Sequence, residues 1–343
     1  MENKNFKVLA IFLLSAFVCV MLTAGCTGTD GSAQTATPTA TAGQTVTATP
    51  APAETAQKEY ADKELLIATT TSLYATGLLD QLAGEFMNDT GVDIKITAVG
   101  TGTALEYGAN GDVDLIMVHD RAREDAFIED GSGTDRRVFG YNYFVIVGPE
   151  SDPAGIKGMA PTEALETILA KGSEGAEGVK FVSRGDSSGT HGKEKALWSV
   201  AGYDYAEYEP VWVKEDWYVE AGTGMGGTLT MADQMDAYTL SDIGTYLKYQ
   251  GDGTVSLAEL VNEGDDLINI YGAILVNPEK YPDTNVEVGK DWVNYLITDG
   301  VQDEIKVFGV SDYGQPLFFP AMGAFDVLSS SGVTQDEISA PLA

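Results

Sequence analysis

The chain has 343 residues, with 52 acidic against 20 basic side chains and a formal net charge of −32. This acidic balance repels phosphate backbones and anionic lipid headgroups at long range, which argues against nucleic-acid binding. Hydrophobic residues make up 44% of the chain, enough for one large or two ordinary domains. Two cysteines cannot form a disulfide framework and two histidines leave little for a zinc site, so we predict no metal and no cofactor.

The N-terminus has the pattern of a targeting segment. Two lysines precede a nearly unbroken apolar run at 8–22, which has the length of a signal-peptide core rather than of a membrane span. The following LTAGC resembles a lipobox, the site at which a prokaryotic lipoprotein is cleaved on the N-terminal side of a lipid-modified cysteine. We therefore predict a signal peptide at 1–25, lipidation of Cys26, and an extracytoplasmic protein anchored to the outer face of the cell membrane. An uncleaved anchor helix is the alternative.

A tract rich in Thr, Ala and Pro follows at 26–58, and Val46 is its only large aliphatic residue. Such a tract cannot bury enough apolar surface to offset the entropy of ordering, so we predict a disordered tether with a reach of roughly 30 Å. Residues 1–58 contain three acidic and three basic side chains. The whole excess of negative charge therefore belongs to 59–343.

The order strand, turn, helix recurs from Glu64 onward. The apolar run LLIATT reads as a strand, and Ser72 is a suitable N-cap for a helix that continues to Gly91. An alternating strand, a second helix from Gly100 and the buried strand DLIMV follow. This βαβαβ pattern predicts a parallel sheet with ligand groups at the carboxyl ends of its strands.

The order strand, turn, helix repeats over 144–241, with a helix near 161–171 and a strand that breaks into the polar turn SRGDSSGTH. We predict two α/β domains with chain crossings near Tyr141–Phe144 and Tyr238–Asp242. A cleft between two domains is where small ligands usually bind.

Three turns carry hydrogen-bond donors at strand-to-helix junctions, namely 69–72, 99–103 and 183–191. Backbone N–H groups are unpaired at a helix N-terminus, glycines allow a close approach, and Arg184 adds positive charge. Each turn also has a simpler interpretation: an N-cap, a tight turn, or an Arg184–Asp186 ion pair. Their recurrence after three strands favours a shared site for a small oxyanion.

The motifs ATTTS, VGTGTAL, DLIMVHD, VSRGDSSGTHGKEKALW, GTGMGGTL, AYTLSDIGTYL and GQPLFFP resemble, in order and spacing, the tungstate-specific substrate-binding proteins of ABC transporters. The resemblance runs from about Glu64 to Pro320. It implies an α/β, two-lobed type II periplasmic-binding-protein fold with the ligand in the interlobe cleft. Lobe 1 would comprise 59–142 and 242–343, and lobe 2 would comprise 143–241.

The resemblance also implies a function and a set of contacts. The protein would be a monomeric solute-binding protein, not an enzyme, that delivers tungstate to a permease with a cytoplasmic ATPase. The matching ligand-binding positions are Thr70, Thr71, Ser72, Thr101, Arg184, Ser188, Gly189 and Thr190. The chain departs from the family pattern at Ile243, where we expect arginine, and at Asp120, where we expect a small residue. Asp120 would add negative charge near the cleft.

The sequence also allows other oxyanion ligands and other classes of protein. Tungstate, molybdate and sulfate are proton-free dianions that need only donors, whereas phosphate keeps a proton and favours a carboxylate acceptor such as Asp186. A Ser188–His191 pair could indicate a hydrolase, although neighbours on one helical turn rarely have attack geometry. His119 could be a metal ligand or a structural residue. A surface adhesin would explain the tether and the acidity but not the donor turns.

Overall fold

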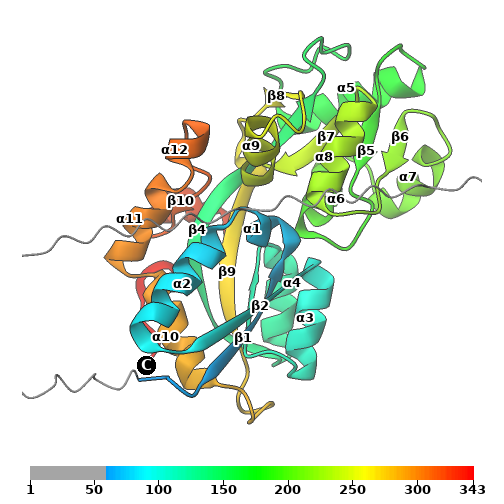
Figure 1. Cartoon of the computed structure of the whole chain (residues 1–343). Coiled ribbons are helices and arrows are strands. Elements are labelled where there is room, and N and C mark those ends of the chain that lie inside the picture. The colour runs from blue at the N-terminus through cyan, green and yellow to red at the C-terminus, as the bar shows by residue number, and fades with distance from the viewer. Residues whose placement is uncertain (1–58) are drawn as a thin grey trace, which may run out of the picture. The chain divides into compact units, whose positions relative to one another are not determined.

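The computed structural model describes residues 59–343 (Figure 1). The predicted signal peptide at 1–25, the lipidation site Cys26 and the tether at 26–58 lie outside the described residues and stay predictions. Among the described residues, no helix has both the length and the apolar character needed to span a membrane.

Ten strands occur in the described part, and β4, with 16 residues, and β9, with 9 residues, are the longest of them. The strands are β1 Glu64–Thr70, β2 Asp93–Val99, β3 Leu115–Val118, β4 Gly133–Gly148, β5 Phe181–Ser183, β6 Tyr218–Glu220, β7 Tyr238–Asp242, β8 Ala258–Val261, β9 Ile268–Val276 and β10 Phe319–Pro320.

Fourteen α-helices and two short 3₁₀ turns connect the described strands. The helices are α1 Thr71–Ala75, α2 Leu78–Thr90, α3 Thr101–Asn110, α4 Arg121–Glu129, α5 Pro161–Ser173, α6 Gly189–Val200, α7 Tyr205–Trp212, α8 Met225–Gln234, α9 Ile243–Gly251, α10 Val286–Leu296, α11 Asp299–Val307, α12 Val310–Tyr313, α13 Phe325–Leu328 and α14 Gln335–Ser339. The 3₁₀ turns are Asp265–Leu267 and Ser329–Ser331.

The strands follow the order β2-β1-β3-β9-β4-β7-β5-β6, with β8 and β10 also pairing with β4. We call β2, β1, β3, β9 and residues 133–143 of β4 the first half-sheet. Residues 144–148 of β4 with β7, β8, β5 and β6 form the second half-sheet. Strand pairing is parallel among β1, β2 and β3 and again among β5, β6 and β7, and antiparallel where β9 or β4 takes part.

Strand β4 carries the chain from one half-sheet to the other without a break (Figure 1). Its pairing changes from β9 at Tyr143 to β7 at Phe144, inside the predicted crossing region. Strand β7, the second predicted crossing, pairs with β4 and β5, and β8 still pairs with β4 before β9 returns to the first half-sheet. The lobe boundaries at 59–142 with 242–343 and at 143–241 stay a prediction.

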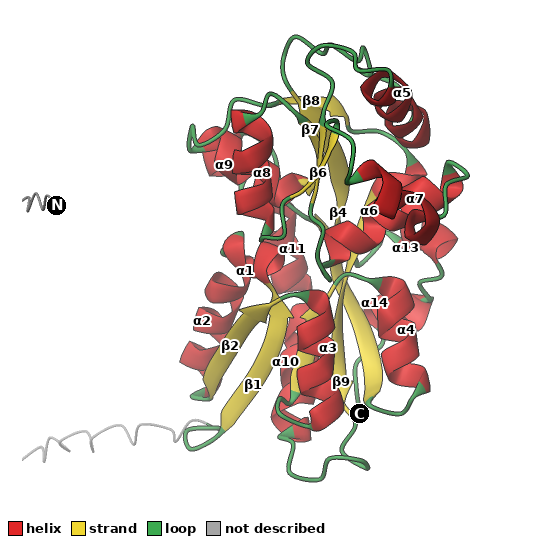
Figure 2. Ribbon diagram, turned by 90° about the vertical axis from the view of Figure 1, so that its right-hand side faces the viewer, coloured by secondary structure: helices red, strands yellow, loops and turns green. Residues whose placement is uncertain are grey.

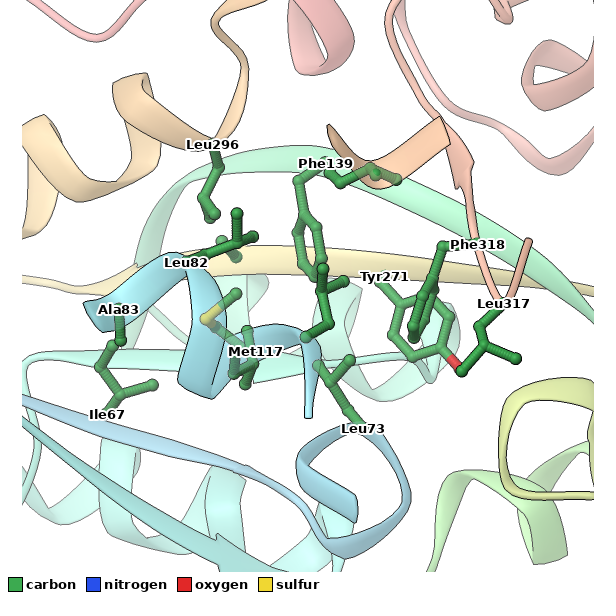
Figure 3. Packing of buried hydrophobic residues seen from close by; sticks show 14 of the residues in the cluster. Ile67, Leu73, Leu82, Ala83, Met117, Phe139, Tyr271, Leu296, Leu317 and Phe318 are labelled. Carbon is green, nitrogen blue, oxygen red and sulfur yellow. The ribbon is translucent and has the colours of Figure 1, made fainter. Parts of the chain in front are cut away.

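Helices cover both faces of the first half-sheet (Figure 2), because its strands have apolar side chains on both faces. All four residues of β3 are buried. Met117 packs with Ile67, Leu82 and Phe139 in one cluster (Figure 3), whereas Ile116 packs with residues of α3 and α4 in another. The second half-sheet has its own cluster, which includes Trp198, Trp212 and Tyr218.

The chain after β1 differs from the prediction of one helix capped by Ser72. Thr70 is the N-cap instead, since its hydroxyl accepts from the backbone N–H of Leu73. Gly77, with φ of 85°, then separates α1 from α2, and Gly91 ends α2 in the left-handed region as expected. The break places the polar turn on its own short helix at the carboxyl end of β1.

Candidate functional site

The first donor turn lies where β1 becomes α1. Thr70 and Ser72 are buried, at 3% and 4% exposure, while Thr71 is exposed. The hydroxyls of Thr70 and Ser72 lie 3.3 Å apart, and the Ser72 hydroxyl lies 3.3 Å from Nε2 of His119. Ser72 is therefore held from two sides, and Thr71 faces a cavity between α1 and α8.

The second turn begins helix α3. Gly100 is the N-cap and supplies no side-chain cap, and Thr101 is the first helical residue. Thr101 is fully buried, and its hydroxyl oxygen has no hydrogen-bond partner among the described residues. Buried polar atoms nearly always have a partner in folded proteins, so an unpaired hydroxyl at this position marks a place where a ligand could bind.

Arg184 follows β5 in the third turn and is 3% exposed. Its Nε and Nη2 donate to a single oxygen of Asp186, at 3.1 and 2.6 Å. The other oxygen of Asp186 accepts from the backbone N–H of Ser188 at 3.0 Å. The Arg184–Asp186 ion pair, which is the simpler interpretation of this turn, is present, and Asp186 also supports the start of the following helix. The carboxylate is thus already engaged by two groups of its own turn.

Helix α6 begins directly after this turn. Ser188 is its N-cap and accepts from the backbone N–H of His191 at 3.1 Å. Gly189 and Thr190 form its first turn and are buried, and the Thr190 hydroxyl, like that of Thr101, has no partner within the described part of the chain. The 12-residue helix therefore presents a buried, donor-rich N-terminus.

Contacts between the half-sheets bring the three turns together. The ring of His119, at the end of β3, contacts Gly189, where an added methyl group would lie 2.7 Å from Cε1. The backbone N–H of Gly102 and Nη1 of Arg123 both donate to the Ser187 carbonyl, at 3.4 and 2.7 Å. All eight predicted ligand positions therefore belong to turns that meet, directly or through His119 and Ser187.

Two cavities flank this meeting point. One of about 200 Å³ is lined by Thr71 and Ser72 on one side and by Gly224–Gly227, at the start of α8, on the other. The second, of about 260 Å³, lies beyond His119 and includes Gly189, Lys193 and Asn269. The site is thus bordered by groups from α1, α6, α8 and β9.

Charge around the site is balanced by short ion pairs. Burial raises the pKa of Asp242, which caps α9 and accepts from the backbone N–H and hydroxyl of Thr245, while Arg184 opposes that rise. Asp120 caps α4 and pairs with Nε of Arg123 at 3.2 Å. The negative charge expected of Asp120 is therefore compensated by a guanidinium that itself contacts the third turn.

The other departure from the family pattern, Ile243, has an apolar environment. Its side chain packs against the main hydrophobic cluster, at the first position of α9. Asp242, beside it, draws its hydrogen bonds from Thr245 instead of from an arginine. The isoleucine thus replaces a possible ion pair by apolar packing.

The histidine of the SRGDSSGTH turn does not form a nucleophile–base pair with Ser188. Nδ1 of His191 contacts the carbonyl of Asp186, and Nε2 lies 2.9 Å from the Tyr205 hydroxyl. Only the backbone N–H of His191 reaches Ser188. Burial lowers the pKa of His191. This geometry suits a ring that supports the turn, and it leaves Ser188 without a general base.

Sequence reasoning missed three groups at the site. The sequence leaves His119 between a metal ligand and a structural residue, and it indicates no role at the site for Arg123 or for Gly224–Gly227. The signal for His119 was its place directly after a buried strand, where the ligand groups of such sheets lie. Nothing in the sequence near Arg123 indicates that its side chain crosses to Ser187.

Comparison with known proteins identifies the family of the chain. A model of the PBP superfamily domain matches residues 32–300. The tungstate-binding protein TupA of Peptoclostridium acidaminophilum is 42% identical over 264 residues, which are 77% of this chain and 88% of that protein. The chain belongs to the tungstate-binding protein family of the PBP superfamily.

Two solved structures are similar to this chain. The tungstate-binding protein TupA from Desulfovibrio alaskensis G20 has a TM-score of 0.63 and 43% identity, covering 75% of this chain and 98% of that one. The tungstate ABC transporter protein from Geobacter sulfurreducens has a TM-score of 0.60 and 43% identity, covering 69% and 95%. The predicted type II periplasmic-binding-protein fold is confirmed. These relatives are named for binding and transport, in agreement with the prediction of a binding protein and not an enzyme.

Proposed function

We propose that this protein captures tungstate outside the cytoplasm, as a lipid-anchored solute-binding protein, and delivers it to an ABC permease driven by a cytoplasmic ATPase. The observation that carries the proposal is the meeting of three donor turns that contain the buried Arg184 and two buried hydroxyls, those of Thr101 and Thr190, with no hydrogen-bond partner in the part of the chain from 59 to 343. A dianion between the turns would accept from hydroxyl and N–H groups of both half-sheets. Its binding would therefore favour the closed arrangement.

The carboxylates near Arg184 favour a proton-free anion. Asp186 already accepts from Arg184 and from the N–H of Ser188, and Asp242 accepts from Thr245. A phosphate that keeps a proton would need a carboxylate acceptor, which these two groups are poorly placed to provide. Tungstate, molybdate and sulfate remain on chemical grounds. The relationship to the tungstate-binding proteins supports tungstate, and we propose that no cofactor takes part.

A ligand panel tests the proposal directly. The purified protein should be titrated with tungstate, molybdate, sulfate and phosphate by calorimetry, and its unfolding followed with each anion. Tungstate at 1,000 times its dissociation constant should add about 4 kcal/mol to the free energy of unfolding. No response to any of the four anions would refute an oxyanion site. A response to phosphate alone would transfer the function to the phosphate alternative.

Arg184→Ala separates the proposed site from the rest of the surface. Loss of a charged hydrogen-bond donor should weaken tungstate binding by roughly tenfold to a hundredfold. Arg137→Ala is the matched control, because Arg137 lies on β4 and donates to the carbonyls of Arg136 and Ala340. Equal affinity of the Arg184→Ala variant and the wild type would show that the site is elsewhere.

The lipid anchor has its own test. Cys26→Ala should prevent acylation and move the protein from the membrane fraction to the soluble fraction, since the apolar run before it is short for a membrane span. Mass spectrometry of the wild type should find a lipid-modified N-terminal cysteine. A wild-type protein that keeps residues 1–25 and carries an unmodified Cys26 would favour the uncleaved anchor helix.

A further inference from the structure

A line of buried polar side chains runs from the first donor turn into the core of the first half-sheet. Ser72, His119, Asn269 and Asn142 are its members, and each is at most 6% exposed. Ser72 Oγ lies 3.3 Å from Nε2 of His119. Nδ2 of Asn269 donates to Oδ1 of Asn142 at 2.9 Å, and Nδ2 of Asn142 donates to the Leu317 carbonyl at 3.2 Å.

The Leu317 carbonyl at the inner end of the line fixes which atoms donate and which accept. A carbonyl can only accept, so Asn142 must present its amide nitrogen to Leu317 and its oxygen to Asn269. Asn269 in turn uses its nitrogen for Asn142 and for the Tyr271 hydroxyl at 2.8 Å. Its oxygen, Oδ1, and Nδ1 of His119 are both buried and have no hydrogen-bond partner within residues 59–343, so each is available to the other.

Burial and the Asn269 side chain act in opposite directions on the protonation of the His119 ring. Burial lowers the pKa of His119 to about 4, and the Asn269 side chain acts in the opposite direction. Burial therefore favours the neutral ring. The oxygen of Asn269 is the acceptor available to Nδ1 of that ring, because the Asn269 nitrogen already donates to Asn142 and to the Tyr271 hydroxyl.

We propose that His119 is a positioning residue for anion binding: it donates from Nδ1 to Asn269, accepts the Ser72 hydroxyl proton at Nε2, and so holds the first donor turn against Gly189 of the third. The inference rests on the proposed function for its link to tungstate. Because the Ser72 hydroxyl proton goes to His119, Ser72 contributes to the site through its fixed position rather than as a free hydroxyl donor. The contact of the ring with Gly189 transmits that position to α6.

A purely structural role for His119 predicts something different. The ring also packs against Tyr271 and Phe144, with centroids 5.0 and 6.3 Å away. If packing were its only role, removal of the imidazole would lower stability, and its effect on affinity would add to that of Ser72→Ala. If the ring acts through Ser72, the two effects on affinity overlap.

The experiment is a double-mutant cycle with tungstate as the titrant. His119→Ala and Ser72→Ala should each weaken binding by about tenfold, and the double variant should be no weaker than the worse single variant. His119→Gln, whose amide oxygen can accept from Ser72, should recover most of the affinity. Additive losses, or wild-type affinity in His119→Ala, would overturn the proposal.

The wild type supplies a readout that needs no variant and no ligand. Nitrogen-15 NMR of the labelled protein near pH 7 should show His119 protonated at Nδ1 and unprotonated at Nε2. The opposite tautomer, or a charged ring, would overturn the inference even if tungstate binds. Absence of any tungstate response would refute the proposed function instead, and the tautomer measurement would still decide the role of His119 in the hydrogen-bond line.

Discussion

At the scale of single residues, burial decides what the polar groups behind the binding turn can do. Glu194 lies beneath the third turn and accepts from the hydroxyls of Ser183 and Tyr218, at 2.7 and 2.9 Å. Burial raises the pKa of Glu194 to about 7. The Ser183 hydroxyl also accepts from the N–H of Gly185, so this acid supports the backbone that carries Arg184.

The raised pKa predicts a pH dependence of stability. Between pH 4.5 and 7 the folded protein keeps the Glu194 proton and the unfolded chain loses it, so the free energy of unfolding should fall as pH rises through this window. The loss should amount to about 3 kcal/mol. Glu194→Gln should remove that part of the pH dependence, which urea unfolding at pH 5 and pH 7.5 can measure.

The control for this prediction is Glu177→Gln, which changes an exposed carboxylate on the same half of the molecule. Its stability should follow the wild-type pH curve. Parallel pH curves for wild type and Glu194→Gln would mean that Glu194 keeps the same protonation state across this range.

At the scale of elements, a helix cap at the site both stabilises the helix and holds the first turn of that helix in the binding site. Ser188 caps α6 and Asp204 caps α7 by the same kind of hydrogen bond, at 3.1 and 3.0 Å. Of these two helices, α6 begins at the meeting point of the three turns and α7 does not. The segment WVNYLITDGVQDEIKVFG contributes to two helices, α10 and α11, which are separated at Ile297 and Thr298.

The two caps form a matched pair of variants. Ser188→Ala and Asp204→Ala should each lower the free energy of unfolding by about 1 kcal/mol. Only Ser188→Ala should also weaken tungstate binding, because the cap holds the first turn of α6 in the site. Calorimetry and thermal unfolding of both proteins give the comparison. Unchanged affinity in Ser188→Ala would remove Ser188 from the proposed contacts.

At the scale of the whole molecule, the net charge of −32 lies on the surface of residues 59–343 and opposes the approach of any anion. Within the site, by contrast, Arg184 and buried donors act at short range, where salt screens little. The acidity therefore excludes polyanionic partners, which must meet the whole surface, but it permits a small dianion. For the small ligand, the negative surface lowers the rate of association.

This separation predicts a salt dependence of association. Raising the salt from 10 to 150 mM shortens the screening length from about 30 to about 8 Å, so the association rate constant for tungstate should increase. Stopped-flow tryptophan fluorescence can follow it, with the dissociation rate constant as the internal reference. A rate constant that falls with salt would mean that a local positive field guides the anion despite the net charge.

The sequence by itself determined the fold class, the order of the elements and the family. Strand-length apolar runs, glycines at helix ends and donor-rich turns are local features, and each depends on residues close together in the chain. ATTTS and SRGDSSGTH therefore indicated the site before any coordinates were considered. The same local reasoning misplaced the first helix cap, since Thr70 and Ser72 are both suitable caps and only the course of β1 selects Thr70.

Only the tertiary structure decided which distant groups meet. His119 contacts Ser72 and Gly189, and Arg123 reaches Ser187, across separations of 47 to 70 residues. These contacts depend on how β4 and β9 place one half-sheet against the other, which no local pattern encodes. Burial likewise lowers the pKa of His119 and raises that of Glu194, because a pKa is determined by the surroundings of a side chain and not by its neighbours in sequence.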